Sequence, residues 1–585
     1  MDSTGFALCA TVKALVIPEI ATLIFSSGSL SQADLASLCR VSQYMSKIAT
    51  QLLWRNVTAE GLLSLIKSTE YYRYKSDSPA FFHLDSYTSD QDNFKMFHFY
   101  AQYVETLEVY DRSGRCYRVE DWYLLRREIR ARNSPLLPNL KALRFASTST
   151  SLGLKEMKWI SVFATPRLEE ISLAPTIYSH VWPILFPIAS TILKTIFEFC
   201  PGIQTLALAT ADDDLDAEEL TKVEGRALAH RPPRPWYQEL KRLTKLRHLT
   251  VSEGWLYPAS LQELGSLPEL ESLTIVPGSL DNFNHKADIE TDLPNGAFPC
   301  LTKLSLLGLD GLGFNAVLSI TGLSRKITIM KLELYFDSLE PEEEFEELFD
   351  GLRHASCLRE LHIRHPFQPE KGDKPINIYS SMENMGLHPS LEHVYLDGIR
   401  IKKRYRRDSR PFRRLAVIWP NVQTLWMPSQ HASLQELKDF ARLTSLSHLT
   451  VKLNLGDPRL PAELKFKSAP LETLTSSGPV RLSTTYKDLS LSARALLRLW
   501  PSLRQVAWSD KDHERTQMAD FFNSQVLRFN REKLFRGLEE DVRLSATQST
   551  TEMKARFKLI LEDVEQPDLN SDTDSDMDTD SETGT

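Results

Sequence analysis

Histidine and cysteine, the side chains that most often bind metals or act as nucleophiles, are dispersed along this chain. The 585 residues include fourteen histidines and six cysteines, and the cysteines stand at positions 9, 39, 116, 200, 300 and 357 with no metal-type spacing. Gly311 and Gly313 begin a glycine-rich run, but Ala316 takes the last glycine position of a GxGxxG motif. No Walker A, GxSxG or HExxH run occurs. The sequence therefore predicts a protein that is not an enzyme and uses no metal or cofactor.

Binding chemistry is more evident at His362, His393, Tyr395 and Trp426. Each flanks the central residue of a recurring triplet, which reads apolar, two residues, apolar, one residue, apolar. The same positions elsewhere hold charged or small residues, among them Ser172, Ala207, Thr250, Thr274, Ser305, Lys331, Glu333, Glu360, Thr424, Thr450, Thr475 and Ala507. Since Tyr and Trp dominate the energetics of protein interfaces, we predict that the four residues form a patch that binds a protein substrate. The alternative is that they form a satellite core beneath a long loop or the basic insert at 400–414.

The triplets that position these residues recur fourteen times, at intervals of 24 to 43 residues. They begin at Val104, Leu140, Leu168, Ile203, Leu246, Leu270, Leu301, Ile329, Leu358, Leu391, Val422, Leu446, Leu471 and Leu503. Eight of them have a proline two residues earlier, which ends a preceding helix before the chain enters a strand. One strand and one helix per repeat is the signature of leucine-rich repeats. An all-helical HEAT-like array is the competing fold, but β-branched residues within the triplets, such as Thr250 and Val251, argue against it.

The array is expected to be irregular and to end in a cap. Only the triplet at Leu446 is followed by the asparagine that usually caps the turn after such a strand, Asn454. Residues 510–564 lose the triplet and read as helical, as a solenoid's last apolar face requires. Residues 565–585 contain eight acids and no Lys or Arg, so they account for the whole net charge of −8 and are expected to be a disordered tail.

The stretch from Ile17 to Val57 predicts three short helices. Pro18 suits a first helical turn, and Ser31 with Asp34 can cap a second helix. The third helix is expected between Tyr44 and Trp54. Because three helices of this length bury too little surface to be stable alone, the unit must pack against the array or a partner.

This stretch resembles the F-box of the large fungal F-box families. The resemblance lies in the Ile-Pro-Glu-Ile opening at Ile17, an Ile-Phe pair at Ile24, the Asp-Leu-x-x-Leu-x-x-Val helix at Asp34, and Leu-Trp-Arg at Leu53. It departs at Ser42-Gln43-Tyr44, where such motifs more often carry a basic residue and Trp. The resemblance implies docking onto the Skp adaptor of a cullin–RING ubiquitin ligase. By the same resemblance the adaptor contacts are Ile17, Pro18, Ile20, Ile24, Leu35, Leu38 and Val41. The alternative is a plain N-terminal cap of the array.

The predicted fold is therefore α/β, with an F-box at 1–58, a junction at 59–103, a leucine-rich-repeat-like solenoid at 104–509, a helical cap at 510–564 and the acidic tail. The resemblance implies a substrate-recognition subunit of a Skp–cullin–F-box ubiquitin ligase, a monomer within that complex. The alternative function is a repeat scaffold without a ligase role. We expect a cytoplasmic or nuclear protein that binds neither nucleic acid nor membrane, since the chain lacks a signal peptide and any apolar run of membrane-spanning length. The basic insert at 400–414 has three interpretations: a nuclear import signal, a site for an acidic partner, or a solvated loop.

Overall fold

The computed structural model describes most of the chain, and the statements below refer to the described residues. These are 17–27, 30–72, 81–84, 92–111, 117–146, 154–173, 184–211, 240–252, 255, 258–276, 293–294, 296–309, 314, 317–334, 341–365, 376–378, 381–401, 411–457, 469–478, 481–482, 485–508 and 520–532.

One long sheet runs through the molecule, and every strand pair along it is parallel. In spatial order the path is β1 (Asn56–Thr58), β4 (Thr106–Glu108), β6 (Ala142–Phe145), β7 (Glu170–Leu173), β9 (Thr205–Leu208), β11 (His248–Ser252), β12 (Ser272–Val276), β13 (Lys303–Leu309), β14 (Ile329–Leu334), β15 (Glu360–Arg364), β17 (His393–Asp397), β19 (Thr424–Ser433), β20 (His448–Leu455), β21 (Thr473–Ser476) and β23 (Gln505–Trp508). The sixteenth strand of the sheet, β22 (Arg481–Leu482), lies off this path and pairs with β20. Spatial order therefore follows chain order, as in a solenoid.

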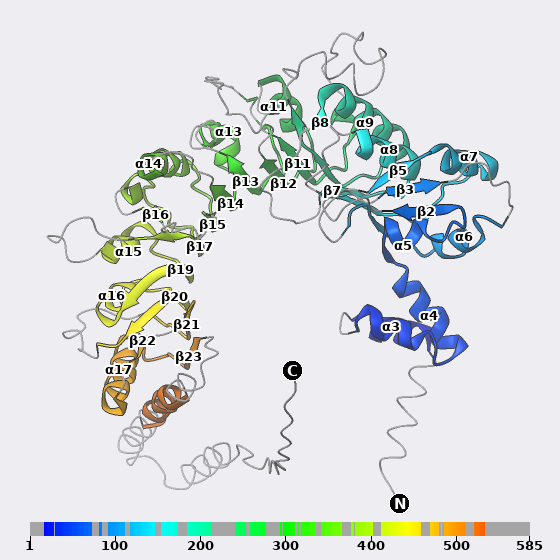
Figure 1. Cartoon of the computed structure of the whole chain (residues 1–585). Helices are drawn as coiled ribbons and strands as arrows, with labels where there is room; N and C mark the ends of the chain where they lie inside the picture. The colour runs from blue at the N-terminus through cyan, green and yellow to red at the C-terminus, as the bar shows by residue number, and fades with distance from the viewer. Residues whose placement is uncertain are drawn as a thin grey trace, which may run out of the picture.

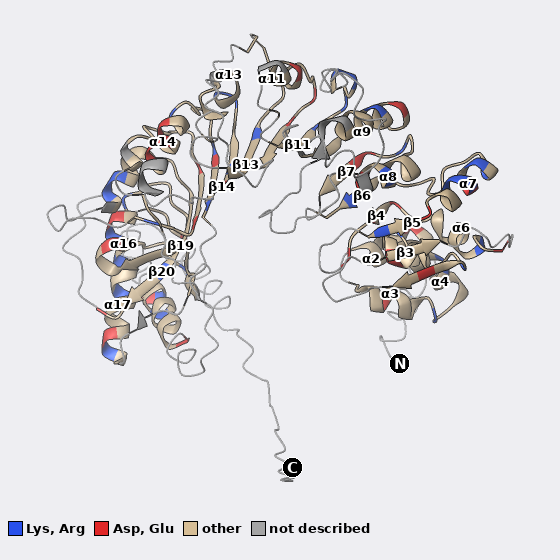
Figure 2. Ribbon diagram, turned by 45° about the horizontal axis from the view of Figure 1, so that its top comes forward, with Lys and Arg blue, Asp and Glu red and all other residues tan. Residues whose placement is uncertain are grey.

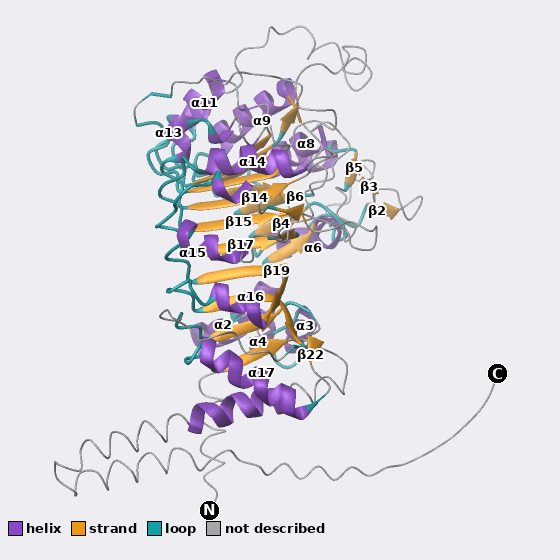
Figure 3. Ribbon diagram, turned by 90° about the vertical axis from the view of Figure 1, so that its left-hand side faces the viewer, coloured by secondary structure: helices purple, strands orange, loops and turns teal. Residues whose placement is uncertain are grey.

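The sheet lines the inner side of an arch, and helices cover its outer side (Figure 1). The outer helices are α7 (Tyr123–Arg132), α8 (Leu154–Phe163), α9 (Phe186–Phe199), α11 (Pro258–Gly265), α13 (Thr321–Ser324), α14 (Pro341–Leu352), α15 (Leu415–Ile418), α16 (Leu434–Phe440) and α17 (Tyr486–Leu499). Seen from the side, the strands lie one above another like rungs (Figure 3). The molecule is thus an α/β solenoid of the leucine-rich-repeat type.

The core lies between the sheet and the outer helices. Most of the described triplet residues point into it, and Leu446, Leu449 and Val451 are at most 1% exposed. The two Trp-Pro tryptophans, Trp419 and Trp500, are fully buried at the ends of their helices. Because each repeat packs mainly on its neighbours, this core is continuous along the arch.

Each of the fourteen predicted triplets coincides with a strand, but one was placed in the wrong register. β14 pairs Met330 with Leu304, so its triplet begins at Ile327 rather than Ile329. Ile327 and Met330 are fully buried, whereas Ile329 is half-buried on the inner face. The sequence is ambiguous here because apolar residues at 327, 329, 330, 332 and 334 fit both registers.

The chain between consecutive repeats is held by shared backbone acceptors. The carbonyl of Gln423 accepts hydrogen bonds from the amides of Ser447 (2.8 Å) and His448 (3.0 Å) of the next repeat. The side-chain amide of Asn421, which follows the Pro420 turn, donates to the carbonyl of Pro389 (2.7 Å). The proline turns therefore place polar groups where they join one repeat to the one before.

The three predicted N-terminal helices are present as α2 (Pro18–Ser26), α3 (Gln32–Leu38) and α4 (Gln43–Leu53). Ser31 and Asp34 form a capping box at the start of α3, and hydrogen bonds from Ser31 lower the pKa of Asp34. A small separate core joins the helices around Ala21, Phe25 and Ile48.

The solenoid begins earlier than the predicted boundary at residue 104. β1, directly after α4, already pairs with β4 in the long sheet. Residues 59–103, predicted as a junction, contain α5 (Ala59–Leu63), β2 (Thr69–Tyr72), β3 (Phe81–Leu84) and α6 (Lys95–Ala101). β2 and β3 form a second, three-stranded sheet with β5 (Arg118–Glu120). Predicting the boundary from the triplet missed β1, in which Val57 aligns with Leu107 of β4.

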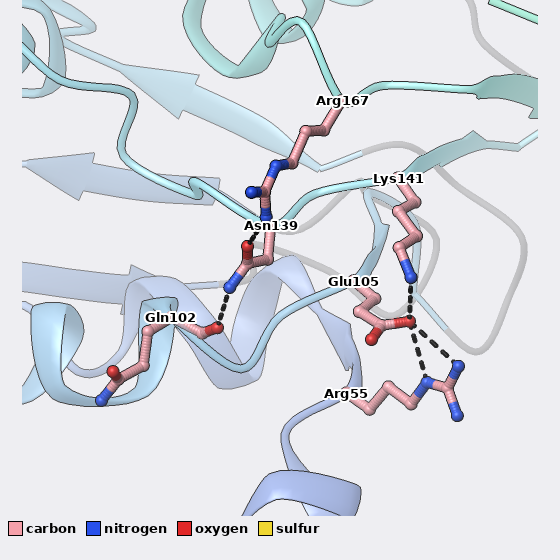
Figure 4. Close-up of polar contacts among 6 residues, drawn as sticks. All are labelled: Arg55, Gln102, Glu105, Asn139, Lys141 and Arg167. Carbon is pink, nitrogen blue, oxygen red and sulfur yellow. Dashed lines mark hydrogen bonds and ion pairs between the residues drawn. The ribbon is translucent and has the colours of Figure 1, made fainter. Parts of the chain in front are cut away.

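Trp54 and Arg55 fasten the helical unit to the array. The indole of Trp54 stacks on Tyr100 of α6 with ring centroids 4.1 Å apart. Arg55 donates to Glu105 (Nε to Oε2, 3.0 Å), and Lys141 reaches the same oxygen at 3.2 Å (Figure 4). Burial raises the pKa of Glu105, but the hydrogen bonds and charges of Lys141 and Arg55 outweigh it, so the net pKa is lowered.

The other end of the sheet is closed by a helix at residues 520–532. Phe522 and Val526 of this helix are fully buried. Asn523 bonds the backbone of the last strand: its Oδ1 accepts from the amide of Val506 (3.2 Å), and its Nδ2 donates to the Val506 carbonyl (3.0 Å). The Asn523 side chain therefore makes the two backbone hydrogen bonds that a neighbouring strand would make at this edge of the sheet.

Several predictions lie outside the described residues. These are most of the basic insert (402–410), two parts of the predicted cap (510–519 and 533–564) and the acidic tail (565–585).

Candidate protein-interaction surfaces

The strand register aligns side chains of the inner face into rows across the sheet. The central row is formed by the residue after the middle of each triplet, and neighbouring members of it are paired in the ladder. From β11 to β23 this central row reads Thr250, Thr274, Ser305, Lys331, His362, Tyr395, Trp426, Thr450, Thr475 and Ala507. Large side chains thus occupy four consecutive strands, and small ones lie on both sides of them.

Three of the four predicted substrate-binding residues stand side by side in this row. The rings of His362 and Tyr395 are stacked, with centroids 4.2 Å apart and planes 15° from parallel. The rings of Tyr395 and Trp426 follow with centroids 6.4 Å apart and are tilted by 49°. All three side chains are half-buried. We call these three residues the aromatic row.

His393 lies outside the aromatic row. It is two residues before Tyr395 on β17, in the neighbouring row between Glu360 and Thr424. Its Nδ1 is buried and has no hydrogen-bond partner in the described part of the chain. The structure therefore places Tyr395 between His362 and Trp426 and leaves His393 beside them.

Glu360 is the charged neighbour of the aromatic row. Its Oε1 is in hydrogen-bond contact with Nε2 of His362, and both side chains are about one-third exposed. Burial, and then the charge of Glu360, raise the pKa of the Tyr395 hydroxyl. Tyr395 is consequently a neutral hydrogen-bonding group on the inner face at physiological pH.

Charged side chains lie on the outer helices, as on α14 and α16, and also on inner strands such as β14 (Figure 2). At the N-terminal strands the inner-face charges pair with one another. Arg144 contacts Glu170 (Nε to Oε1, 3.2 Å) and Glu108 (Nη1 to Oε1, 3.8 Å), and Ser172 also donates to Glu170 (2.6 Å). These groups have their electrostatic partners within the chain.

A second candidate surface is the exposed apolar face of α2. Ile17, Ile20 and Ile24 are between 39% and 45% exposed, and Pro18 is also exposed. Val41, on the turn after α3, is 64% exposed. A helix face this apolar normally packs against something, and in the described chain nothing covers it.

The remaining two predicted adaptor contacts have a different position. Leu35 is 8% exposed and belongs to the small core of the three helices, and Leu38 packs against that core. The predicted adaptor contacts omit Leu23, which is 73% exposed and is the most open of the large apolar side chains of α2. Leu23 follows Ile20 by three residues, and this spacing already places both side chains on the same face of the helix. We define the α2 face as Ile17, Pro18, Ile20, Leu23 and Ile24.

Among the described residues, no group of three or more His, Cys, Asp or Glu side chains could hold a metal ion. In the same part of the chain, no helix is both long and apolar enough to cross a bilayer.

The solved structures that this chain resembles share little of its sequence. No protein-family model and no curated protein matches the sequence. An internalin (inlF) from Listeria monocytogenes is 13% identical, with a TM-score of 0.24, and the alignment covers 54% of this chain and 75% of that one. The TLR13 chain of a TLR13–ssRNA13 complex is 13% identical, with a TM-score of 0.31, and the alignment covers 72% of this chain and 58% of that one.

Proposed function

We propose that this protein is the substrate-recognition subunit of a Skp–cullin–F-box ubiquitin ligase, located in the cytoplasm or nucleus. The α2 face would bind the Skp adaptor and, through it, the cullin, while the inner face of the solenoid would bind a protein substrate. The protein itself carries out no chemistry. It accelerates ubiquitin transfer by holding the substrate near the ubiquitin-carrying enzyme, which raises the effective concentration of the reacting groups.

The observation that carries this proposal is the apolar α2 face at the F-box-like spacing. Ile17, Ile20 and Ile24 repeat along one side of a helix that begins at a proline. That side stays exposed, while the adjacent side, with Ala21 and Phe25, fills the small core. This arrangement supports a unit built to bind a partner.

A scaffold without a ligase role is the second candidate. It is favoured by the contacts of Trp54 and Arg55, which fix the three helices to the array as a simple terminal cap would require. In that case the inner face would still bind a protein, and no adaptor or cullin would be recruited.

Co-purification with the Skp adaptor and cullin separates the two functions. The test variant is Ile20→Asp with Leu23→Asp, because both side chains are exposed and the folded core is left intact. The matched control is Val417→Asp on α15, where an equally open apolar residue, 69% exposed, lies on the outer side of the array. We expect the wild type and the control to bring down adaptor and cullin, and the α2 variant to lose both. If the wild type binds neither, the protein is a scaffold.

A further inference from the structure

Helix α7, on the outer side of the arch near its N-terminal end, carries a row of arginines on one face (Figure 1). Arg126, Arg127 and Arg130 are all exposed, and Tyr123 beside them is 58% exposed. The spacing of i, i+3, i+4 and i+7 places these four residues on one side of the helix, whereas Leu124 is fully buried. We call Arg126, Arg127 and Arg130 the arginine face, and their helix is marked in blue in Figure 2.

The carboxylates near the arginine face do not neutralise it. Glu128, the single acid of α7, has its Oε1 2.8 Å from Nε2 of His98 on α6. Asp121 is exposed before the start of the helix. Within the described residues, no arginine of this face forms an ion pair, and Arg126 donates to the hydroxyl of Ser161 on α8 (Nη2 to Oγ, 3.4 Å). The arginine face is therefore positive, with no competing acid bound to it.

This placement of charge is unfavourable for the helix itself. Arg126 and Arg127 lie four and three residues before Arg130, and like charges at these spacings repel one another. Arg130 lies in the last turn, where the helix dipole favours a cation, but Arg126 and Arg127 lie too far from that end to benefit. A ligand with several carboxylates would relieve the repulsion, because each guanidinium can bind a carboxylate in a bidentate manner.

The C-terminal tail of this same chain has carboxylates at a matching spacing. From Asp572 to Glu582 every second residue is an acid, and residues 565–585 contain no Lys or Arg. In an extended chain alternate side chains point to the same side and follow one another at about 6.6–6.8 Å. Arg126 and Arg130 are about one helical turn apart, or about 6 Å along the helix axis. Successive acids of the tail can therefore meet successive arginines of α7.

The tail is also long enough to reach α7 from the other end of the arch. In the chain α7 lies directly before β6, and β6 is twelve strand intervals from β23, or about 58 Å along the sheet. Residues 533–571, which join the C-terminal helix to the acidic run, span up to about 130 Å when fully extended. Because the tail and α7 belong to one chain, the connection raises the effective concentration of one at the other.

We propose that the acidic run 572–582 binds the arginine face of α7 within the same molecule. This inference goes beyond the ligase function proposed above and does not depend on it. A nucleic acid fits the arginine face less well, because three arginines within about one helical turn contact few phosphates and residues 1–564 carry no net charge.

Photo-crosslinking in the full-length protein tests the contact. Benzoylphenylalanine in place of Met577, in the middle of the acidic run, should capture the segment that contains α7, which peptide mass spectrometry identifies. The R126E/R127E/R130E variant should reduce the yield of this crosslink at least about tenfold. The control changes the net charge by the same amount and should crosslink as the wild type does. It reverses three exposed basic residues of α9 and α17, as K194E/K487E/R498E.

A charge-swapped protein separates loss of attraction from loss of folding. It combines the α7 variant with a basic run in the tail, as D572K/D574K/D576K/D578K/D580K/E582K. Attraction of reversed sign should restore the crosslink to α7, which an unfolded α7 would not do.

Three outcomes would overturn the proposal. One is a crosslink to α7 that R126E/R127E/R130E leaves unchanged, or capture of the basic insert at 400–414 instead of α7. Another is a crosslink that forms covalent dimers with a yield that rises with protein concentration, since the contact would then join two molecules. The third is salt-dependent binding of a single-stranded oligonucleotide that the α7 variant abolishes, without capture of α7 by the tail.

Discussion

Replacing Asn523 by leucine should weaken the C-terminal end of the solenoid and leave the rest intact. Leucine has a similar size but can bond neither the amide nor the carbonyl of Val506, so two hydrogen bonds are lost. Each neutral hydrogen bond contributes about 0.5–1.5 kcal/mol, which gives a loss of about 1–3 kcal/mol. Because repeats contact mainly their neighbours, this loss should be confined to the last one or two strands.

Amide hydrogen exchange read by mass spectrometry measures this effect strand by strand. A loss of about 1–3 kcal/mol corresponds to an exchange rate of the β23 segment, 505–508, about 5- to 150-fold faster, while β11 should be unchanged. The control is Ser524→Ala, since the Ser524 hydroxyl donates only within its own helix, to the carbonyl of Phe521 (2.6 Å). If N523L exchanges at β23 no faster than S524A, the asparagine does not protect the edge.

Three further predictions concern the junction and the thiols. Trp54→Ala removes the stacking on Tyr100, worth about 0.5–1.5 kcal/mol beyond the buried area, and should speed proteolysis within α4 without changing the urea midpoint of the array. The pKa of Glu105 is lowered in the folded protein, so its ion pairs stabilise the junction above the unfolded pKa of about 4.3 and are lost as the pH falls through the lower folded value. Glu105→Gln should therefore abolish the acid-dependent rise of hydrogen exchange at the junction, and an unchanged pH profile would contradict this. Burial raises the pKa of the Cys200 thiol to about 11, so at pH 8 iodoacetamide should leave it unmodified in the native protein while Cys300, which is exposed, reacts; peptide mass spectrometry distinguishes the two.

The repeat architecture could be predicted from sequence because its cause is local. A proline that ends a helix and an apolar triplet that follows it act within six or seven residues, and all fourteen triplets coincide with strands of the sheet. The one register error arose where apolar residues stand on both faces of a strand, so that the alternation between Ile327 and Leu334 specifies no single face. Side-chain periodicity alone cannot resolve such a case.

Features that depend on distant residues were not predictable from the pattern. The stacking of Trp54 on Tyr100 and the bonds of Asn523 to Val506 join segments with no shared motif. The residues of the aromatic row could be named from the sequence because they occupy equivalent positions in their triplets. The alignment of Lys331 with Ser305 was missed, because it follows from the corrected register of β14.

The parallel sheet also gives the arch a definite mechanical character. Its path of fifteen strands has fourteen strand-to-strand interfaces in series, with no connection that bridges the two ends of the sheet among the described residues. A rotation of about 1° at each interface would accumulate to about 14° from end to end, although no single contact is strained appreciably. The arch should therefore bend easily along its length, between the three N-terminal helices at one end and the C-terminal helix at the other. A ligand bound across β14 to β19 would restrict bending in the middle of the arch. It would thereby change the distance between the N-terminal and C-terminal helices.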